Sequence, residues 1–292
     1  MTSDITFIGF GEAASAIVSG WDATRDIRSY DIKTDAPETA QSQQDRFAAF
    51  GVTGCQSSAQ AVSGARLVFS TATADQAVVT ARTAAPHLAP GTFWFDLNSC
   101  APSSKREAAA LLAARDVRYV DVAVMAPIHP KKNMTPLLVS GPHAQEAHAI
   151  LTGLPMAPTI VEGPVGAASS IKMIRSVMVK GMEALTAECC LAARAAGVEE
   201  AVLASLAGSN PAMNWPEQAA YNFERVMQHG IRRAAEMREV VKTLEDLDLP
   251  ADMARATVAW QSRIGGLGVT ADEDATYGDL ADVLLPHIAG KS

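Results

Sequence analysis

The chain has 292 residues, long enough for one large or two ordinary domains, and its 48% hydrophobic content predicts a packed globule instead of a disordered chain. Its formal net charge of −8, with no basic stripe, argues against nucleic acid as a partner. No run of about 18 uncharged apolar residues occurs, so the sequence predicts no membrane span.

The cysteines and histidines show neither a disulfide pattern nor a metal-binding pattern. None of the four cysteines forms a C-x-x-C pair, and the six histidines form no H-E-x-x-H cluster. Cys189 and Cys190 are adjacent and would point to different faces of a helix, which makes them poor joint ligands. We therefore expect reduced thiols, no metal site and a cytoplasmic protein.

The first candidate site lies in the segment ITFIGFGEAA, residues 5–14. Its apolar run stops at Gly9, which predicts a short buried strand that turns directly into a helix. Gly9, Gly11 and Ala14 fit the G-x-G-x-x-G/A fingerprint, in which glycines permit a tight turn and a close approach to a pyrophosphate. Alone this motif is weak. If it binds a dinucleotide, the contacts come from Gly9, Phe10, Gly11, Glu12 and Ala13.

A second predicted strand, residues 27–32, carries Asp31. It follows the first glycine by about 20 residues, the spacing at which an acidic side chain holds the adenosine ribose. Because a carboxylate repels a 2′-phosphate, we expect NAD in preference to NADP, although Lys33 could soften that preference. The alternative interpretation of Asp31 is a solvated acid in a turn.

Strand and helix patterns then alternate to about residue 151, which predicts an open α/β sheet. Strands are expected over 52–53, 67–70, 92–97, 117–124 and 137–140, with helices over 57–62, 75–85, 105–115 and 144–151. Small and hydroxyl residues follow the strand ends, among them Thr71, Ala72, Asn98 and Ser99. In a parallel sheet the carboxyl ends of the strands form the ligand-binding edge.

Prolines and glycines between residues 155 and 166 predict a domain boundary, and only helical patterns follow. The longest spans 167–196 and ends before Gly197, which stands in the position of a C-cap. Further helices are expected over 215–228, 231–247 and 250–264. We therefore predict an α/β Rossmann-type domain over 1–163 and an all-helical (all-α) C-terminal domain over 164–292.

The long helix offers Lys172 as a candidate acid–base group. Ser176, Lys180 and Glu183 follow it on the same helix face. A lysine shielded from water loses stabilisation of its charge, and a lowered pKa would suit proton transfer near neutrality. The alternative is a solvated lysine on an exposed stripe, and spacing alone favours that alternative.

Five motifs occur in order along the chain: IGFGEAA, LVFSTATA, FDLNSCAP, DVAVMAP with PLLVSGP, and GPVGAASSIKMIRS. Together they resemble the β-hydroxyacid dehydrogenase family, which includes 3-hydroxyisobutyrate and 6-phosphogluconate dehydrogenases. The resemblance implies hydride transfer between NAD(P) and the C3 carbon of a small β-hydroxy or β-oxo acid. It implies that Lys172 is the acid–base catalyst, that Thr71, Ala72 and Asn98 lie beside the cofactor, and that Ser99 orients the substrate. It also implies a homodimer.

The chain departs from the family pattern at the expected substrate loop. Met125, Ala126 and Pro127 stand where the family usually has Ser-Gly-Gly, and Ser176 stands where it usually has asparagine. We therefore expect a rebuilt pocket in a divergent branch of the family, lined by Met125, Ala126 and Ser176.

Arg232 and Arg233 are candidates for replacement contacts to an acidic substrate. They share a predicted helix face with His229 and Glu236, and arginine can bind a carboxylate through two hydrogen bonds. The alternative interpretation of this stripe is an ordinary solvated, ion-paired face.

Two other functions stay open. Relatives of this fold reduce C=N bonds and lack the carboxylate loop, so an imine reductase is one alternative. A dinucleotide-binding protein without turnover is the other, and Lys172 would then be incidental.

Overall fold

The computed structural model describes residues 4–21, 25–270, 272 and 274–288. The chain forms two compact units, Met1–Met173 and Ile174–Ser292. The split falls inside helix α7 (Ala167–Ala196), the helix expected over the same residues. The predicted boundary after residue 163 lies in the loop before this helix, whereas the first turns of α7 belong to the first unit.

The first unit is built on one sheet, which has eight strands in its described residues, in the order β3-β2-β1-β4-β5-β6-β7-β8. The strands are β1 (Ile5–Ile8), β2 (Ile27–Tyr30), β3 (Thr53–Gly54), β4 (Leu67–Ser70), β5 (Phe93–Asp96), β6 (Arg118–Val124), β7 (Pro136–Ser140) and β8 (Ala157–Ile160). Neighbours are parallel except β6 and β7. The strand order reverses between β1 and β4, and such a switch point is where open α/β sheets bind ligands. The predicted Rossmann-type architecture is confirmed.

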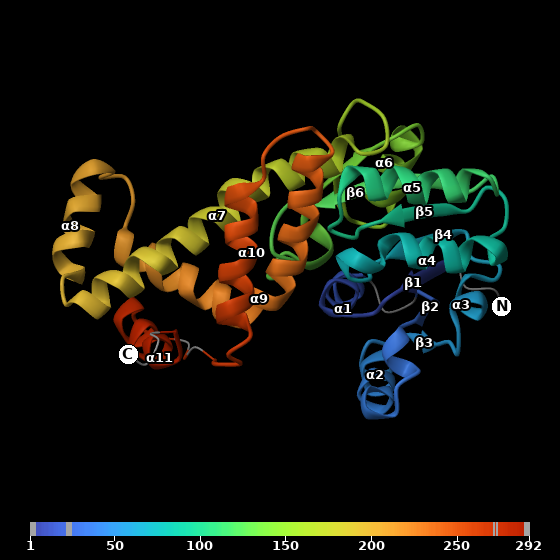
Figure 1. The fold of residues 1–292 in the computed structure, drawn as a ribbon. Helices are drawn as coiled ribbons and strands as arrows, with labels where there is room; N and C mark the ends of the chain where they lie inside the picture. Colours follow the sequence, from blue (N-terminus) through green and yellow to red (C-terminus); the bar gives the residue numbers. More distant parts are fainter. Residues whose placement is uncertain (1–3, 22–24, 271, 273, 289–292) are drawn as a thin grey trace. The chain divides into compact units, whose positions relative to one another are not determined.

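Helices pack on both faces of this sheet and bury two separate cores. They are α1 (Glu12–Ser19), α2 (Pro37–Ala49), α3 (Ser58–Val62), α4 (Ala77–Ala84), α5 (Pro102–Ala113) and α6 (Ala144–Gly153). Side chains of α1 and α6 share one core with Phe7, Phe69 and Phe95, while α3, α4 and α5 share the other with Trp94. Figure 1 shows α4 and α5 side by side in front of the strands. The alternation of strand side chains between the faces explains why both faces need cover.

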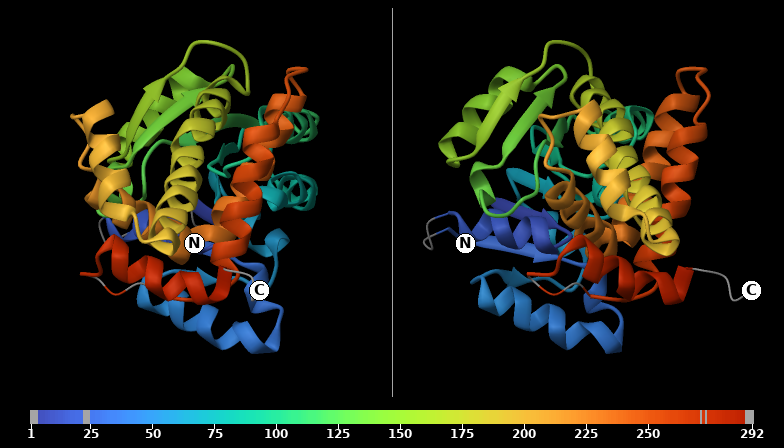
Figure 2. Two further views of the ribbon diagram at one scale, coloured as in Figure 1. Left: turned by 60° about the vertical axis from the view of Figure 1, so that its left-hand side comes forward. Right: turned by 90° about the vertical axis from the view of Figure 1, so that its left-hand side faces the viewer.

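The structure adds a strand that the sequence analysis missed. β8 contains Pro158 and follows Pro155, and these prolines were taken to mark only a boundary. Proline is tolerated here because β8 is an edge strand that pairs only with β7 among the described strands. β7 and β8 appear as neighbouring yellow-green arrows in both views of Figure 2.

The described residues of the second unit form only helices, as expected. They are the remainder of α7, α8 (Glu199–Ser209), α9 (Trp215–Glu245), α10 (Asp252–Gly265) and α11 (Tyr277–Ile288). The sequence analysis did not anticipate α8 or α11. No helix in the described part of the chain is long and apolar enough to cross a membrane.

The prediction of two helices over 215–228 and 231–247 is wrong, because α9 runs through Gly230 without a break. A Cβ atom on Gly230 would lie 2.5 Å from the carbonyl oxygen of Gln261 and 2.7 Å from the Cα of Gly265, both in α10. Figure 2 shows α9 and α10 side by side as a hairpin. The glycine therefore serves close packing of two helices and does not end a helix.

Candidate functional site

The parallel strands bring the predicted cofactor residues to one edge of the sheet, where β1, β2, β4 and β5 end. Gly9 has φ +84°, and its amide donates a hydrogen bond to the carbonyl of Tyr30 at 2.8 Å. A Cβ atom here would lie 2.9 Å from the carbonyl oxygen of Thr71. The Thr71 hydroxyl donates to the Gly9 carbonyl at 2.7 Å. The first glycine thus makes the tight turn that the motif requires.

Gly11 stands in a different environment, immediately before α1. It occupies the N-cap position and provides no side chain to bond the free amides of the first turn. A Cβ atom built on Gly11 would meet nothing within 4 Å. The space beside this helix N-terminus, next to Glu12 and Ala13, is therefore open and suits a phosphate group. The side chain of Phe10 is fully buried, so Phe10 can contribute only its backbone.

Asp31 holds the glycine turn to the end of β2. The residue is 8% exposed, which excludes the alternative of a solvated turn acid. One carboxylate oxygen accepts a hydrogen bond from the Phe10 amide at 2.7 Å, and the other accepts from the Lys33 amide at 3.0 Å. The carboxylate is thereby fixed beside the turn, at the place where a ribose hydroxyl is expected.

Asn98 presents a buried acceptor at the same edge. The residue is 3% exposed, and its side-chain amide donates to the Ser70 hydroxyl at 2.8 Å. Its Oδ1 atom has no hydrogen-bond partner among the described residues. Leaving a buried acceptor unsatisfied costs about 1–3 kcal/mol, and a ligand that donates an N–H would recover that energy. Together with the open space at Gly11, this acceptor fits a nicotinamide dinucleotide.

The next residue, Ser99, contacts the predicted catalytic lysine. The ammonium of Lys172 donates to the Ser99 hydroxyl oxygen at 2.6 Å, and both residues lie in the first unit. Lys172 is half-buried on α7, so it is not a fully solvated lysine on an exposed stripe.

A buried ionic cluster of Lys105, Asp96 and Asp121 lies next to the turn that carries Ser99, and the sequence analysis missed it. Lys105 of α5 lies 2.9 Å from Asp96 and 3.6 Å from Asp121, and all three side chains are fully buried. The hydroxyl of Tyr119 donates to Asp96 at 2.7 Å. Burial alone lowers the pKa of Lys105, but electrostatic interactions with Asp96, Cys100 and Asp121 outweigh burial and raise that pKa above its usual value. The lysine is therefore charged. The sequence feature that could have indicated this cluster is an aspartate, Asp96 or Asp121, in each of two otherwise apolar strand patterns.

The residues predicted to rebuild the substrate loop follow β6. The Met125 amide donates to the Pro136 carbonyl at 2.9 Å and so extends the ladder between β6 and β7. Met125 and Ala126 are half-buried. Neither side chain offers a hydrogen-bond donor for a carboxylate, unlike the serine that the family usually has there.

The arginine stripe on α9 differs from the prediction. Arg233 is buried, and its guanidinium donates to the carboxylate of Glu183, with an Nε–Oε2 distance of 2.8 Å. Arg232 is exposed, so the two arginines do not share one environment. Either Arg232 or Arg233 was expected to neutralise a substrate carboxylate, and the structure instead pairs Arg233 with Glu183 inside the helical unit.

Ser176 is also part of the internal polar contacts of the helical unit. Its hydroxyl accepts a hydrogen bond from Lys180 at 3.4 Å, and Lys180 lies 2.7 Å from Glu236. The stripe is thus ion-paired at Arg233 and Glu236, as the alternative interpretation had it, but Arg233 is buried, Glu236 is half-buried and only Arg232 is exposed.

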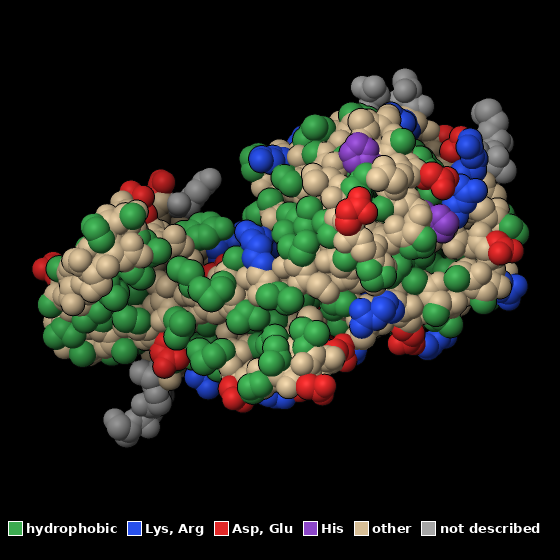
Figure 3. Space-filling model, turned by 90° about the horizontal axis from the view of Figure 1, so that it is seen from above, with side chains coloured by type: hydrophobic (Ala, Val, Ile, Leu, Met, Phe, Trp, Pro, Cys, Tyr) green, Lys and Arg blue, Asp and Glu red, His purple; other side chains and the backbone are tan. Residues whose placement is uncertain are grey.

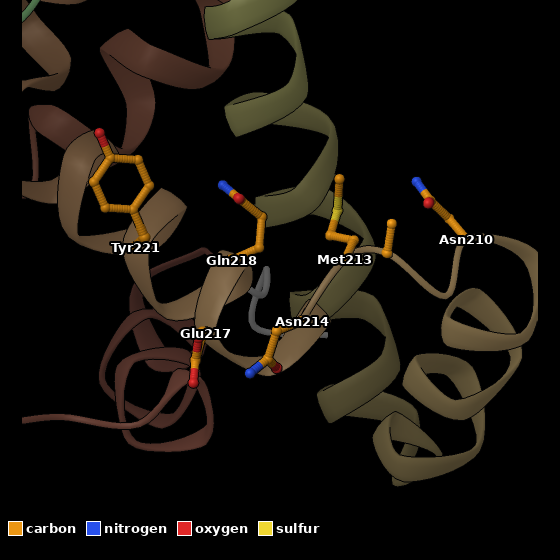
Figure 4. A pocket seen from close by; sticks show the side chains of 7 residues that line it. Asn210, Met213, Asn214, Glu217, Gln218 and Tyr221 are labelled. Atoms are coloured by element: carbon orange, nitrogen blue, oxygen red, sulfur yellow. The ribbon is translucent and has the colours of Figure 1, made fainter.

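A separate surface pocket lies in the helical unit, near the start of α9 (Figure 4). Its walls are formed by Asn210, Ala212, Met213, Asn214, Glu217, Gln218 and Tyr221. None of these belongs to the predicted cofactor or substrate residues, so we place the candidate site at the sheet edge.

Two protein-family models match the chain. Residues 4–154 match the family model for the NAD binding domain of 6-phosphogluconate dehydrogenase. Residues 193–264 match DUF1932, a domain of unknown function. No curated protein sequence matches the chain.

Solved structures share the fold over nearly the whole chain. A conserved hypothetical protein from Sinorhizobium meliloti 1021 is 35% identical, with 99% of this chain and 97% of that chain covered and a TM-score of 0.73. MTH1747, a protein of unknown function described as similar to 3-hydroxyacid dehydrogenases, is 28% identical, with coverages of 91% and 99% and a TM-score of 0.67.

The 3-hydroxyisobutyrate dehydrogenase of Mycobacterium tuberculosis, solved with L-serine, is 17% identical, with coverages of 97% and 99% and a TM-score of 0.72. At this identity the match speaks for the fold alone. The family match over residues 4–154 covers more than half of the chain. The chain therefore belongs to the family that carries the NAD binding domain of 6-phosphogluconate dehydrogenase, here joined to a DUF1932 domain on a 3-hydroxyacid dehydrogenase-like fold.

Proposed function

We propose that this protein is an NAD(P)-dependent oxidoreductase that acts at the C3 carbon of a small β-hydroxy or β-oxo acid. The observation that carries the proposal is the 2.6 Å hydrogen bond from Lys172 to Ser99, next to the buried acceptor of Asn98. When bound, the nicotinamide cofactor supplies the hydride acceptor or donor. Family membership supports this cofactor class.

The residues at this edge divide the remaining work. In oxidation the neutral amine of Lys172 takes the hydroxyl proton of the substrate, and in reduction its ammonium gives a proton to the carbonyl oxygen. Ser99 accepts a hydrogen bond from Lys172, so its own hydroxyl proton can be donated to the substrate oxygen and orient it. The Oδ1 atom of Asn98 would accept a hydrogen bond from the amide N–H of the nicotinamide group. Gly11 leaves space for the pyrophosphate.

The residues proposed to contact the substrate are predicted from the sequence. Met125, Ala126 and Ser176 stay predicted lining residues, and Arg232 is the remaining arginine candidate for an acidic group, since Arg233 pairs with Glu183. The apolar Met125-Ala126 pair also favours a second candidate function, reduction of a cyclic imine, because an imine needs no carboxylate loop. Parallel assays with β-hydroxy acids and cyclic imines separate the two enzymes.

Replacement of Gly11 by alanine tests the cofactor site. The added methyl group meets no protein atom within 4 Å, so the melting temperature should stay close to that of the unchanged protein. The methyl group enters the space meant for the pyrophosphate, so the dissociation constant for NADH should rise at least about tenfold, or about 1.4 kcal/mol. Fluorescence titration with NADH measures this effect. Unchanged NADH affinity would place the cofactor elsewhere.

The position of Asp31 predicts a preference between the two nicotinamide cofactors. Its buried carboxylate should repel the 2′-phosphate of NADPH, so NADH should bind at least about tenfold more tightly. Titrations with both reduced cofactors under the same conditions measure the ratio. The control is Asp31→Asn, which keeps the size of the side chain and should narrow the gap. Tighter binding of NADPH would contradict the assignment.

Replacement of Lys172 by alanine tests the catalytic role. Loss of a general acid–base group should lower kcat by about 100- to 10,000-fold, while NADH affinity stays within about twofold. The assay follows nicotinamide absorbance with a panel of β-hydroxy acids. Lys131→Ala, on an exposed loop lysine, is the matched control and should keep full activity. Undiminished turnover in Lys172→Ala would remove Lys172 from the mechanism.

We also propose that the protein forms a homodimer. Support comes from α7, where Ile174, Met178 and Leu185 are 49%, 65% and 56% exposed at spacings that share one helix face. Figure 3 shows hydrophobic side chains spread over much of the visible face of the helical unit. Apolar area of this kind marks interaction surfaces.

Light scattering after size exclusion should give twice the 30.7 kDa mass of one chain. A charge at Met178, as in Met178→Glu, should shift the protein to the monomer, since burying an unpaired carboxylate is unfavourable. The exposed substitution Glu38→Gln on α2 is the control. A wild-type protein that elutes as a monomer at micromolar concentration would refute the dimer.

A further inference from the structure

We propose that Lys105 is a positioning residue that holds Lys172 against Ser99 through the carboxylates of Asp96 and Asp121. The inference deepens the proposed function and rests on it only for the effect on turnover. Lys105 itself touches neither of the two site residues in any contact described above. Its influence is carried by two short chains of hydrogen bonds, all of them within the first unit.

The starting point is a pair of acids on neighbouring strands. Asp96 ends β5 and Asp121 lies in β6, and the two residues are direct partners in the parallel register. Both side chains are fully buried, where two negative charges side by side repel strongly. The Lys105 ammonium lies within ion-pair distance of both. Its positive charge therefore offsets the repulsion between the two carboxylates.

The first chain runs from Asp121 to Lys172. Asp121 Oδ2 accepts hydrogen bonds from the amides of Gly166 and Ser169 at 3.1 and 3.0 Å, and from the Ser169 hydroxyl at 3.0 Å. The Ser140 hydroxyl donates to the same oxygen at 3.1 Å and accepts from the Ala168 amide at 3.0 Å. These amides belong to the start of α7, where helix N–H groups lack internal partners and favour a negative charge. Lys172 lies one turn further along.

The second chain runs from Asp96 to Ser99. Asp96 Oδ1 accepts from the Asn98 amide at 2.9 Å as well as from Lys105. Lys105 also donates to the backbone carbonyl of Asp96 at 2.6 Å, and the Tyr119 hydroxyl holds the second carboxylate oxygen. The turn that presents Ser99 is thus fixed to the same ammonium as the first turn of α7. Both ends of the Lys172–Ser99 contact depend on one buried charge.

The test measures how accessible the Lys172 amine is, which requires no substrate. A limiting amount of an amine-acylating reagent is added, and peptide mass spectrometry compares labelling of Lys172 with labelling of the exposed Lys131 in the same sample. In Lys105→Met the ratio of Lys172 to Lys131 labelling should rise about two- to tenfold. This is the change expected when one hydrogen bond, that between Lys172 and Ser99, is lost.

Two further variants separate positioning from general loss of stability. Thr92→Val removes a buried hydrogen bond to the Ala65 carbonyl at the other end of β5, and should leave the ratio unchanged. Ser140→Ala keeps all three buried charges and removes the hydroxyl that donates to Asp121 and accepts from the Ala168 amide. It should raise the ratio in the same direction and less than Lys105→Met. If Lys105→Met fails to fold, Ser140→Ala decides.

The outcomes distinguish this inference from the proposed function. A labelling ratio in folded Lys105→Met, or in Ser140→Ala, equal to that of the unchanged protein would overturn the positioning role. An increased ratio supports it even if no β-hydroxy acid is turned over, and in that case only the proposed function fails. Where turnover is found, Lys105→Met should lower kcat by about tenfold or more and change KM less.

Discussion

The carboxylate of Asp121 joins the start of α7 to the centre of the sheet. Its Oδ2 atom accepts from Gly166, Ser140 and Ser169, so the helix begins at one defined place on β6. A buried carboxylate is tolerated only with compensation, and here the compensation comes from Lys105 and from the N-terminal end of a 30-residue helix. The position of Lys172, and with it the proposed chemistry, depends on this attachment.

The cofactor edge is preorganised in a similar way. The Thr71 hydroxyl donates to the Gly9 carbonyl and Asp31 accepts from the Phe10 amide, so hydrogen bonds within the protein define the shape of the turn. The open features are those that a ligand would complete, namely the space at Gly11 and the acceptor of Asn98. A turn that needs no rearrangement loses little conformational entropy on binding, which favours affinity.

Charged side chains of the second unit form ion pairs and hydrogen bonds between its helices. Arg233 pairs with Glu183, Gln261 donates to the same carboxylate at 3.2 Å, and Lys180 pairs with Glu236. These contacts connect α7 with α9 and α10. Removing one partner of such a buried pair leaves a charge without compensation, which typically costs about 3–5 kcal/mol. Arg233 and Glu236, in the stripe that was expected to bind a substrate carboxylate, therefore form ion pairs within the helical unit.

The sequence by itself determined the Rossmann-type class, the glycine turn, the extent of α7 and the helical character of the second unit, because these follow from local periodicity and glycine spacing. It also singled out Lys172 and Ser99, because the motifs that carry them occur in the order seen in the β-hydroxyacid dehydrogenase family. Only the tertiary structure decided that these two side chains meet, that Gly230 serves helix packing, and that Pro158 lies in an edge strand. The ionic cluster around Lys105 belongs to this second group. Its members come from separate strands and helices, and local patterns carry no information on which distant charges the fold brings into contact.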